Sequence, residues 1–552
     1  MRKNNFATVD GGAVFMAPLF LYCDYLGGRF YGIDGERKFK GESFETLFSE
    51  LRRIRETRLR HFRTHSPELL VIVNDLNVFE VLVREYIGDA QSAGEKESFG
   101  SVHALEVRAG GFLFRNFNFI ANSRPEPLCD FFGVKNPVQA MTLFCEKLAG
   151  ERKRKLYSLR WTLAYITKKA FYHDIAPDLW EEMKKEQIFF HSLTHYKDMF
   201  VGNKAGALLR FDDPERSFRR IREHITSYDK KSAYPSVFVN DDIFPLSRPI
   251  RVMKGKADAL INAIHFRHWF KIVIRRKDPE PELLPFQDPD EPELYGIEYY
   301  DFLLLRDVLG VSARRFAELL NASKWSLYVC KHTGYLAAAF RQRIAEYYVQ
   351  KEAIKDKKNF YRFTLKTQLD MLFGKAIQRK DFRSVKEVNK HYTGRGDNYL
   401  LPQHSMHAIS AVRYELMRAV KLCGDSCIAY DTDAAKVEGD GRIFEALNEE
   451  IRMKNEHAGY PLLNIGFWMH EWTSERFLQL CTKSYFFELE GEVCTKHAGI
   501  TDRDFRRYLD TLPENEDLFE HFQTPRTLSV LGKYCYLPDE HRFIRQVNTF
   551  EL

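Results

Sequence analysis

Carboxylates at two places in the chain have neighbours that suit metal-ion chemistry. Asp229 follows the apolar residue Ile225 and precedes a turn that Pro235 closes, so its carboxylate is expected at the end of a strand. Asp431 and Asp433 lie in a tight turn between two short apolar segments. Mg²⁺ is usually held by one or two carboxylates, with its other positions left to water and phosphate oxygens. These residues therefore indicate a divalent-cation site beside a phosphate.

Each of these segments, taken alone, also fits a polar surface turn. Around the Asp431–Asp433 turn, apolar residues on both sides favour burial. Two buried acids repel each other and are expensive to bury, whereas a bound cation relieves the repulsion. The pair therefore favours a cation site. Tyr234, five residues after Asp229, is placed where its ring could stack beneath a sugar.

A basic pair of helices is predicted after residue 334. One helix covers Tyr335–Lys355, and Asn359 is a suitable N-cap for a second, which runs to about residue 378. Arg362 and Lys366 share a face of the second helix at a spacing of four and are suited to gripping a triphosphate. The alternative is a core helical hairpin with solvated lysines, but the face is unusually basic for that. Its basic residues are Arg341, Lys351, Arg362, Lys366 and Lys375.

The composition is that of a globular protein of several domains. A chain of 552 residues is too long for one core, and about two to four domains are expected. Apolar residues make up 44% and aromatic residues 14%, which excludes a disordered protein. The net charge of +6 is small for this size. Its distribution says more, because several basic clusters with interleaved Phe and Tyr favour a phosphate-binding surface.

The cysteines and the hydropathy pattern bear on the compartment. Nine cysteines are scattered without metal-ligand spacing, which is typical of a reduced cytosolic protein. No apolar run approaches the roughly 20 residues that span a membrane, so a soluble protein with no membrane partner is expected.

Alternating strands and helices in the first 200 residues predict a mixed α/β fold. The segment 278–293 is acidic and holds prolines that forbid a regular element, so an exposed loop is expected there. The predicted strands are 15–25, 29–33, 69–73 and 427–430, and the further predicted helices are 43–62, 78–86 and 408–422.

In order and spacing, the acidic segments resemble the family B DNA polymerases, and most closely the protein-primed polymerases of small phages. The D-x-x-S-x-Y-P motif of that family is matched by Asp229, Ser232, Tyr234 and Pro235, and its Y-x-D-T-D-S motif by Asp431–Asp433. The resemblance covers about residues 195–552 and is weak before them.

The other two family motifs are also present. The fingers motif K-x-x-x-N-S-x-Y-G is matched by Lys366 and by Phe373–Lys375. The K-x-Y motif is matched by Lys483 and Tyr485, which share one face of a predicted strand and would say little by themselves. The four motifs are specific in combination.

The resemblance implies that a primer 3′-hydroxyl attacks the α-phosphate of a dNTP at two Mg²⁺ ions, for which Mn²⁺ can substitute. Asp229 and Asp433 would be the bridging metal ligands and Asp431 a secondary one, so these three are the catalytic residues. Tyr234 would be a steric gate against a 2′-hydroxyl. The implied nucleotide site comprises Ser232, Ala233, Tyr234, Lys351, Arg362, Lys366, Asp370 and Phe373. The implied primer and DNA contacts are Gly374, Lys375, Lys483 and Tyr485.

Some residues depart from the family pattern. Asp370-Met371 stands where the family has Asn-Ser, Phe373 replaces a Tyr, and Ala434 follows the palm acids where Ser is usual. An acidic side chain near a triphosphate is unfavourable unless it faces away. Altered nucleotide selection is therefore expected.

The family's N-terminal domain is a 3′–5′ exonuclease that holds two metals with the motifs D-x-E, N-x-x-x-D and Y-x-x-x-D. Only one of the four carboxylates has a counterpart here, so a degenerate exonuclease kept as a scaffold or single-strand holder is expected. The nearest matches are Asp10 with Gly12, Asn74 with Val78, and Tyr157 with Trp161.

The implied fold class is a multidomain α/β and α+β protein: an RNase H-like domain, then a right-hand palm, fingers and thumb. Residues 251–334 stand where protein-primed relatives insert a segment for the priming protein, and a second insertion is short. The expected domains are exonuclease-like 1–195, palm 196–250, first insertion 251–334, fingers 335–378, second insertion 379–402, palm 403–470 and thumb 471–552.

Three functions remain open from the sequence. The first is a DNA polymerase without proofreading that acts on a DNA primer-template and dNTPs, in the cytoplasm of a bacterial or phage-infected cell. A priming protein or another subunit is a further partner that the resemblance allows. The second is a nucleotidyltransferase with an unusual or absent template or primer requirement, and the third is a non-catalytic DNA-binding pseudo-polymerase. The intact acids argue against the third, because buried charges cost stability without a metal.

Overall fold

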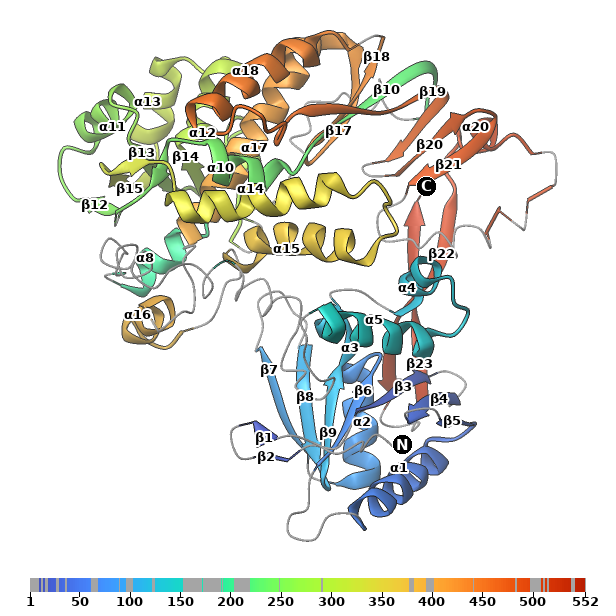
Figure 1. The fold of residues 1–552 in the computed structure, drawn as a ribbon. Helices are drawn as coiled ribbons and strands as arrows, with labels where there is room; N and C mark the ends of the chain where they lie inside the picture. The colour runs from blue at the N-terminus through green and yellow to red at the C-terminus, as the bar shows by residue number, and fades with distance from the viewer. Residues whose placement is uncertain are drawn as a thin grey trace. The chain divides into compact units, whose positions relative to one another are not determined.

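The chain folds into two compact units (Figure 1). Unit 1 consists of residues 1–167, 354–368 and 531–548, and unit 2 of 168–353, 369–530 and 549–552. The computed structural model describes all residues except 1–8, 11–12, 15–17, 26–28, 35–36, 61–67, 89, 96–102, 122–124, 152–170, 172–189, 191, 203–218, 248, 289–290, 377–381, 394–401, 440, 482–483, 497–507, 510–511, 514–515, 538–541 and 552.

A seven-stranded sheet of order β5-β4-β3-β6-β9-β8-β7 lies at the centre of unit 1 (Figure 1). The middle strands β3, β6 and β9 are parallel, and the outer strands are antiparallel to their neighbours. The order β5-β4-β3-β6-β9, with these directions, is the core of RNase H-like folds and confirms the predicted class of this domain. The strands are β3 Leu19–Asp24, β4 Arg29–Asp34, β5 Arg37–Gly41, β6 Leu69–Val73, β7 Gln91–Glu95, β8 His103–Ala109 and β9 Phe112–Asn116.

Local sequence explains the best-packed elements of unit 1. All five residues of β6 are buried, as expected for an apolar parallel strand covered on both faces. Helix α1 (Phe44–Leu59) begins at Ser43, whose side chain accepts a hydrogen bond from the Thr46 N–H. Helix α2 (Leu76–Ile87) packs against it, with the Phe48 and Phe79 rings stacked at 5.6 Å. The remaining elements are β1 Val9–Asp10, β2 Ala13–Val14, α3 Phe117–Ala121, α4 Pro125–Phe132 and α5 Pro137–Glu151.

Unit 2 is built on a six-stranded antiparallel sheet of order β17-β18-β10-β19-β20-β21 (Figure 1). The long, largely buried helix α17 (Pro402–Cys423) packs against β18 and against α10 (Ala233–Asn240). The strands are β10 Ile221–Lys230, β17 Cys427–Asp431, β18 Ala434–Glu438, β19 Trp468–Cys481, β20 Ser484–Leu489 and β21 Glu492–Lys496.

Unit 2 also contains a four-stranded sheet of order β12-β15-β13-β14, which lies almost wholly within the predicted first insertion. Its elements are β12 Ile250–Val252, α11 Lys256–His265, β13 Trp269–Arg275, η3 Leu284–Phe286, β14 Leu294–Glu298, α12 Tyr299–Leu303, η4 Leu304–Val308, α13 Ala313–Asn321 and β15 Lys324–Cys330. Unit 2 also contains α8 Leu193–Asp198, β11 Phe244–Pro245, β16 Thr333–Gly334, α14 Ala338–Ala353, α16 Val385–Thr393, η5 Gly424–Ser426, α18 Ile443–His457 and α20 Leu518–His521.

Three elements have residues in both units: α15 (Phe360–Ala376) and the hairpin of β22 (Thr527–Leu537) and β23 (Arg542–Glu551). Helix α15 begins where the sequence predicted, because the Asn359 Oδ1 accepts hydrogen bonds from the Tyr361 and Arg362 N–H groups at 2.9 and 3.2 Å. The other predicted helices and strands are present, most with ends within a few residues of the prediction, but the helix predicted at 408–422 begins six residues earlier, at Pro402. Among the described residues, no helix is both long and apolar enough to cross a membrane.

The prediction of an exposed loop at 278–293 is wrong in part. Among the described residues of the segment, η3 is the only helix, as the prolines require, but Leu283 and Phe286 are fully buried. The Arg315 guanidinium lies 2.9 Å from a Glu280 oxygen and 3.1 Å from a Glu282 oxygen. Two apolar side chains and two ion pairs therefore fix a segment whose composition indicated only solvation.

The structure also corrects the assignment of Asp10 to the exonuclease motif. Asp10 lies in β1, which pairs with β2 and is not part of the seven-stranded sheet. The strand beside Asn74 is β3, which ends at Asp24, and Leu26 follows two residues later in the sequence. We therefore propose Asp24 with Leu26 for the D-x-E position, which still leaves one carboxylate. Tyr157 and Trp161 lie outside the described residues.

Asn74 holds two strands of unit 1 together. Its Oδ1 accepts from the Cys23 N–H at 3.0 Å, and its Nδ2 donates to the Cys23 carbonyl at 3.2 Å. Both bonds are buried, so this amide satisfies backbone groups that would otherwise lack partners. The side chain has a structural role in addition to its place in the motif.

Candidate active site

The predicted palm acids lie in one row across three neighbouring strands of the unit 2 sheet. Asp431 on β17 is the register partner of Ala434 on β18, and Ala434 is the partner of Asp229 on β10. Partners in a row project to the same face of a sheet, so Asp229 and Asp431 flank the small side chain of Ala434. The Lys230 N–H donates to the Asp433 carbonyl at 2.8 Å and extends the row into the turn. The structure therefore brings the three acids together, as the sequence predicted.

The turn that carries Asp433 has an unusual backbone. Thr432 has a φ of +52°, although it is β-branched. The Asp433 N–H donates to the Asp431 carbonyl at 2.5 Å, and the Thr432 hydroxyl donates to the Asp431 Oδ1 at 2.8 Å. A positive φ at the centre of such a three-residue turn is uncommon and strained. Strain of this kind is often found where side chains must be held for function.

The other acidic segment contains a second strained turn. After Asp229 the chain leaves β10 and enters α10 through Ser232, which has a φ of +49°. Ala233 is buried at the first turn of α10, and Tyr234 follows it. Burial raises the pKa of the Tyr234 hydroxyl, and Asp433 and Asp431 raise it further. The predicted steric gate therefore lies within the electrostatic reach of the acids.

Four carboxylates create a strongly negative site. Burial, together with repulsion from Asp229, Asp431 and Asp370, raises the pKa of Asp433 to about 7. Asp370 is exposed on α15 but still contributes, so the acid that replaces the usual Asn adds to the repulsion. A cation is the simplest means of relieving it.

A buried lysine that the sequence analysis missed compensates part of this charge. Lys230 is 2% exposed and forms an ion pair with Glu415 of α17, which Lys454 also contacts at 2.8 Å. The positive charge of Lys230 lowers the pKa of Asp433. No local pattern reveals this pair, because Lys230 and Glu415 are 185 residues apart in the sequence.

A second buried lysine near this site is Lys351, which the sequence analysis proposed as a nucleotide-binding residue. It lies at the end of α14, is 7% exposed, and donates from Nζ to the Ser232 hydroxyl at 3.0 Å. Its Nζ also lies 3.2 Å from a Glu352 oxygen and 4.9 Å from the centre of the Tyr348 ring. Lys351 thus places a positive charge at the strained turn that follows Asp229.

Other predicted site residues are not placed beside the acids by the structure. Arg362 and Lys366 lie in unit 1, where the Arg362 Nε donates to the Ile354 carbonyl at 3.0 Å and Lys366 is exposed. Gly374 is exposed on α15, the side chains of Phe373 and Lys375 are not among those described, and Lys483 lies outside the described residues. The roles of these residues stay predictions.

Tyr485 of β20 has a neighbour that the sequence analysis also missed. The Nζ of Lys436 lies 4.8 Å from the centre of the Tyr485 ring. Burial raises the pKa of the Tyr485 hydroxyl, as do Glu471, Asp431 and Asp229, so the ring lies within reach of the palm acids. Tyr485 also packs with Phe477 and Phe487 in a hydrophobic cluster.

Across the described parts of the chain, no group of three or more His, Cys, Asp and Glu side chains is gathered closely enough to form a ready metal cage. The donors nevertheless fit Mg²⁺, which usually takes one or two protein carboxylates and completes its shell with water and substrate phosphates. Burial raises the pKa of Asp433, as does repulsion from its neighbouring carboxylates, and a bound cation would favour its charged form.

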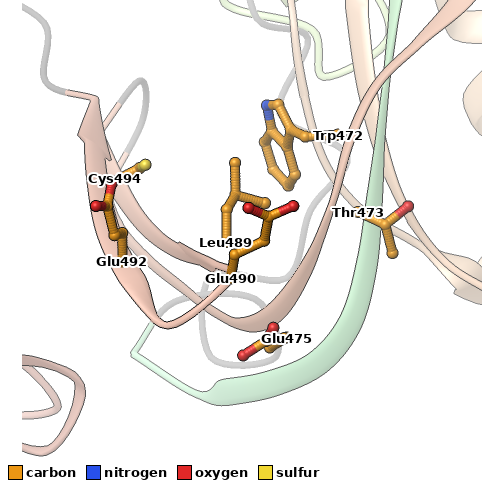
Figure 2. A pocket seen from close by; sticks show the side chains of 7 residues that line it. All are labelled: Trp472, Thr473, Glu475, Leu489, Glu490, Glu492 and Cys494. Carbon is orange, nitrogen blue, oxygen red and sulfur yellow. The ribbon is translucent and has the colours of Figure 1, made fainter.

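A cavity of about 540 Å³ lies farther along the same sheet (Figure 2). Figure 2 shows Trp472 and Leu489 among the side chains that line it, together with the side chains of Glu475, Glu490 and Glu492. The carboxylates of Glu475, Glu490 and Glu492 line it and are unsuited to a phosphate ligand. We call Asp229 and Asp431, with Asp433 in the adjoining turn, the acid row. The cavity is lined by other residues and does not fit a nucleotide.

Because the acids of this row repel one another, removing the charge of one of them should stabilise the folded protein. An acid whose pKa is raised to about 7 in the folded state destabilises that state progressively as the pH rises from about 4 to 7, and fully above 7. Without divalent ions, Asp433→Asn should therefore stabilise the protein by about 1–2 kcal/mol at pH 8. Below pH 4 the gain should vanish.

Thermal unfolding at pH 8 and at low pH measures this effect. Asp258→Asn on the exposed side of α11 is the control and should leave the midpoint nearly unchanged at both pH values. A lower midpoint for Asp433→Asn at pH 8 would contradict the coupled-acid description.

Comparison with known proteins identifies the fold. No protein-family model and no curated protein sequence matches this chain. Among solved structures, it is similar to phi29 DNA polymerase complexed with primer-template DNA, with a TM-score of 0.63, 13% identity, and coverage of 97% of this chain and 100% of that chain. A complex of phi29 DNA polymerase with primer-template DNA and incoming nucleotides has a TM-score of 0.60 at 12% identity, over 97% of this chain and 99% of that one.

A third structure, phi29 DNA polymerase with single-stranded DNA, has a TM-score of 0.62 at 12% identity over the same shares of the two chains. At such low identity the likeness concerns the fold, and it extends over the N-terminal domain, where the sequence resemblance was weak. The predicted resemblance is therefore confirmed: the chain has the fold of phi29 DNA polymerase, a protein-primed family B polymerase.

Proposed function

We propose that this protein is a DNA-directed DNA polymerase that adds dNTPs to a primer 3′-hydroxyl without proofreading. The observation that carries the proposal is the row of Asp229, Ala434 and Asp431, with Asp433 in the adjoining turn, on one face of the unit 2 sheet. The fold of a DNA polymerase surrounds this row. Primer-template DNA and dNTPs are the proposed partners, and a cytoplasmic location remains part of the proposal.

In this mechanism the protein mainly stabilises the charges of the reacting groups and positions the reactants. Asp229 and Asp433 would hold the ions and Asp431 would assist, while its Oδ1 accepts a hydrogen bond from the Thr432 hydroxyl within the turn. Bound Mg²⁺ or Mn²⁺ would stabilise the negative charge that develops on the attacking and leaving oxygens. Lys351 offsets charge on the triphosphate from behind Ser232, and Arg362 and Lys366 are the proposed further cations. The Tyr234 ring excludes a 2′-hydroxyl.

A second candidate is a nucleotidyltransferase with a relaxed template or primer requirement. The observation that favours it is Asp370, whose negative charge reaches Asp433 at the place where the family carries a neutral amide. Extra negative charge beside a triphosphate weakens binding of the nucleotide and changes which metal or nucleotide is accepted. A pseudo-polymerase is disfavoured, because the charged row costs stability unless it is used.

Primer extension with Mg²⁺ or Mn²⁺ separates these candidates when templated, untemplated and primer-free reactions are compared. The polymerase proposal predicts templated extension only. Asp433→Ala should reduce extension by at least about a thousandfold, since transition-state charge stabilisation of this kind is worth several kcal/mol. Asp258→Asn is the matched control and should extend normally. No extension with any metal or primer would overturn the enzyme proposal, and an active Asp433→Ala variant would overturn the site.

Loss of proofreading is tested separately. A 3′-labelled primer held with Mg²⁺ and no dNTP should remain intact, because a single carboxylate, Asp24, cannot hold the two ions that exonuclease chemistry needs. Restoring acids with the double change Leu26→Glu and Val78→Asp is an informative comparison. Shortening of the primer by the unchanged protein would show that the degenerate-exonuclease proposal is wrong.

A further inference from the structure

Lys436 is a buried cation without a conventional partner. Its side chain is 3% exposed on β18. Among the described residues, its ammonium makes no hydrogen bond or ion pair, and the Tyr485 ring at 4.8 Å is its stabilising neighbour. Burial lowers the pKa of Lys436, while Asp431 and Glu471 raise it. A buried charge that remains unpaired is costly, and a bound anion would recover that cost.

The side chain lies on the face of the sheet that carries the acids. Ala434 and Lys436 are two residues apart on β18, so both project to the face shared by Asp229 and Asp431. Lys436 is the register partner of Ser227, two residues before Asp229 on β10. Its position is thus about 7 Å farther along the strand than the acid row, on the side away from the turn.

Two other donors adjoin this position. The Tyr485 hydroxyl belongs to a residue that is 6% exposed and makes no hydrogen bond within the described part of the chain. Lys496 on β21 is the register partner of Tyr485 and is exposed. Two ammonium groups and a phenol offer donors to one place, and this suits a ligand with charged acceptor oxygens such as a phosphodiester.

We propose that Lys436, with Tyr485 and Lys496, binds a backbone phosphate of the primer strand and so positions its 3′ end at the acid row. This inference rests on the proposed polymerase function and adds a residue that none of the recognised motifs contains. Lys436 is a primer-binding residue in this scheme, and the Tyr485 ring fixes the direction of its ammonium. The unpaired lysine is then a site completed by DNA.

Equilibrium binding of the full chain to a labelled primer-template, without divalent ions and at several salt concentrations, tests the proposal. Lys436→Met keeps the length of the side chain but removes its charge. It should weaken binding by about tenfold and reduce the salt slope by about 1, as expected for one lost phosphate contact. Lys436→Arg should restore most of the affinity, because it keeps the charge.

Lys256→Met is the matched control. The Lys256 Nζ lies 4.9 Å from the centre of the Trp325 ring and donates to the Trp325 carbonyl at 2.7 Å, so this lysine also stacks on an aromatic ring but lies in the insertion. Its replacement should leave both affinity and salt slope unchanged. Equal losses for Lys436→Met and Lys256→Met, or an unchanged salt slope for Lys436→Met, would overturn the proposal.

Kinetics supply a readout that a purely structural role would not give. Lys436→Met should raise KM for the primer-template about tenfold while KM for dNTP stays constant. A fall in kcat alone would overturn the inference. If Lys436→Met does not fold, Tyr485→Phe decides: affinity about threefold weaker supports the proposal, and unchanged affinity overturns it. Failure of the polymerase proposal is recognised separately, because the unchanged protein would then not extend a primer.

Discussion

Mutual repulsion among the carboxylates at the ends of neighbouring strands in one sheet is the constraint on which the rest of this structure depends. Asp229 and Asp431 occupy the same row on either side of Ala434, and Asp433 is held just beyond it. Like charges on neighbouring, partly buried side chains oppose folding. The chain nevertheless holds them there with two turns in which Ser232 and Thr432 adopt positive φ values. Both the electrostatic and the backbone cost point to a site that a cation completes.

The surrounding charges have a consistent arrangement. Lys230 offsets the charge of Asp433 and pairs with Glu415 of α17, and Lys351 donates to Ser232 in the turn before α10. Both lysines are bound to protein partners, so they belong to the scaffold of the site. Lys436 differs, because its ammonium is buried without such a partner. This difference is why Lys436, unlike Lys230 and Lys351, is proposed to bind DNA.

Local patterns predicted much of this fold. The apolar run of β6 and the cap at Asn359 follow from sequence because their causes lie within a few residues. The acid motifs could also be recognised, because they are defined by the order and spacing of residues along the chain. The RNase H-like domain could be confirmed only from the strand order of its sheet. That order moved the proposed D-x-E position from Asp10 to Asp24.

Long-range partners could not be predicted in the same way. The Lys230–Glu415 pair and the stacking of Lys436 on Tyr485 join strands and helices far apart in sequence. A lysine that is buried in the fold has the same appearance in a sequence as a solvated one. For the same reason, the packing of Leu283 and Phe286 within an acidic, proline-rich segment was missed.

The central claim is that Asp229, Asp431 and Asp433 form a two-metal site. The most direct measurement counts bound Mn²⁺ by electron paramagnetic resonance, in the full chain with a dideoxy-terminated primer-template and the matching dNTP. The proposed mechanism predicts about two ions per chain, and no more than one in Asp433→Asn. Asp258→Asn should bind as many ions as the unchanged protein. Equal Mn²⁺ binding by the unchanged protein and Asp433→Asn would contradict the account.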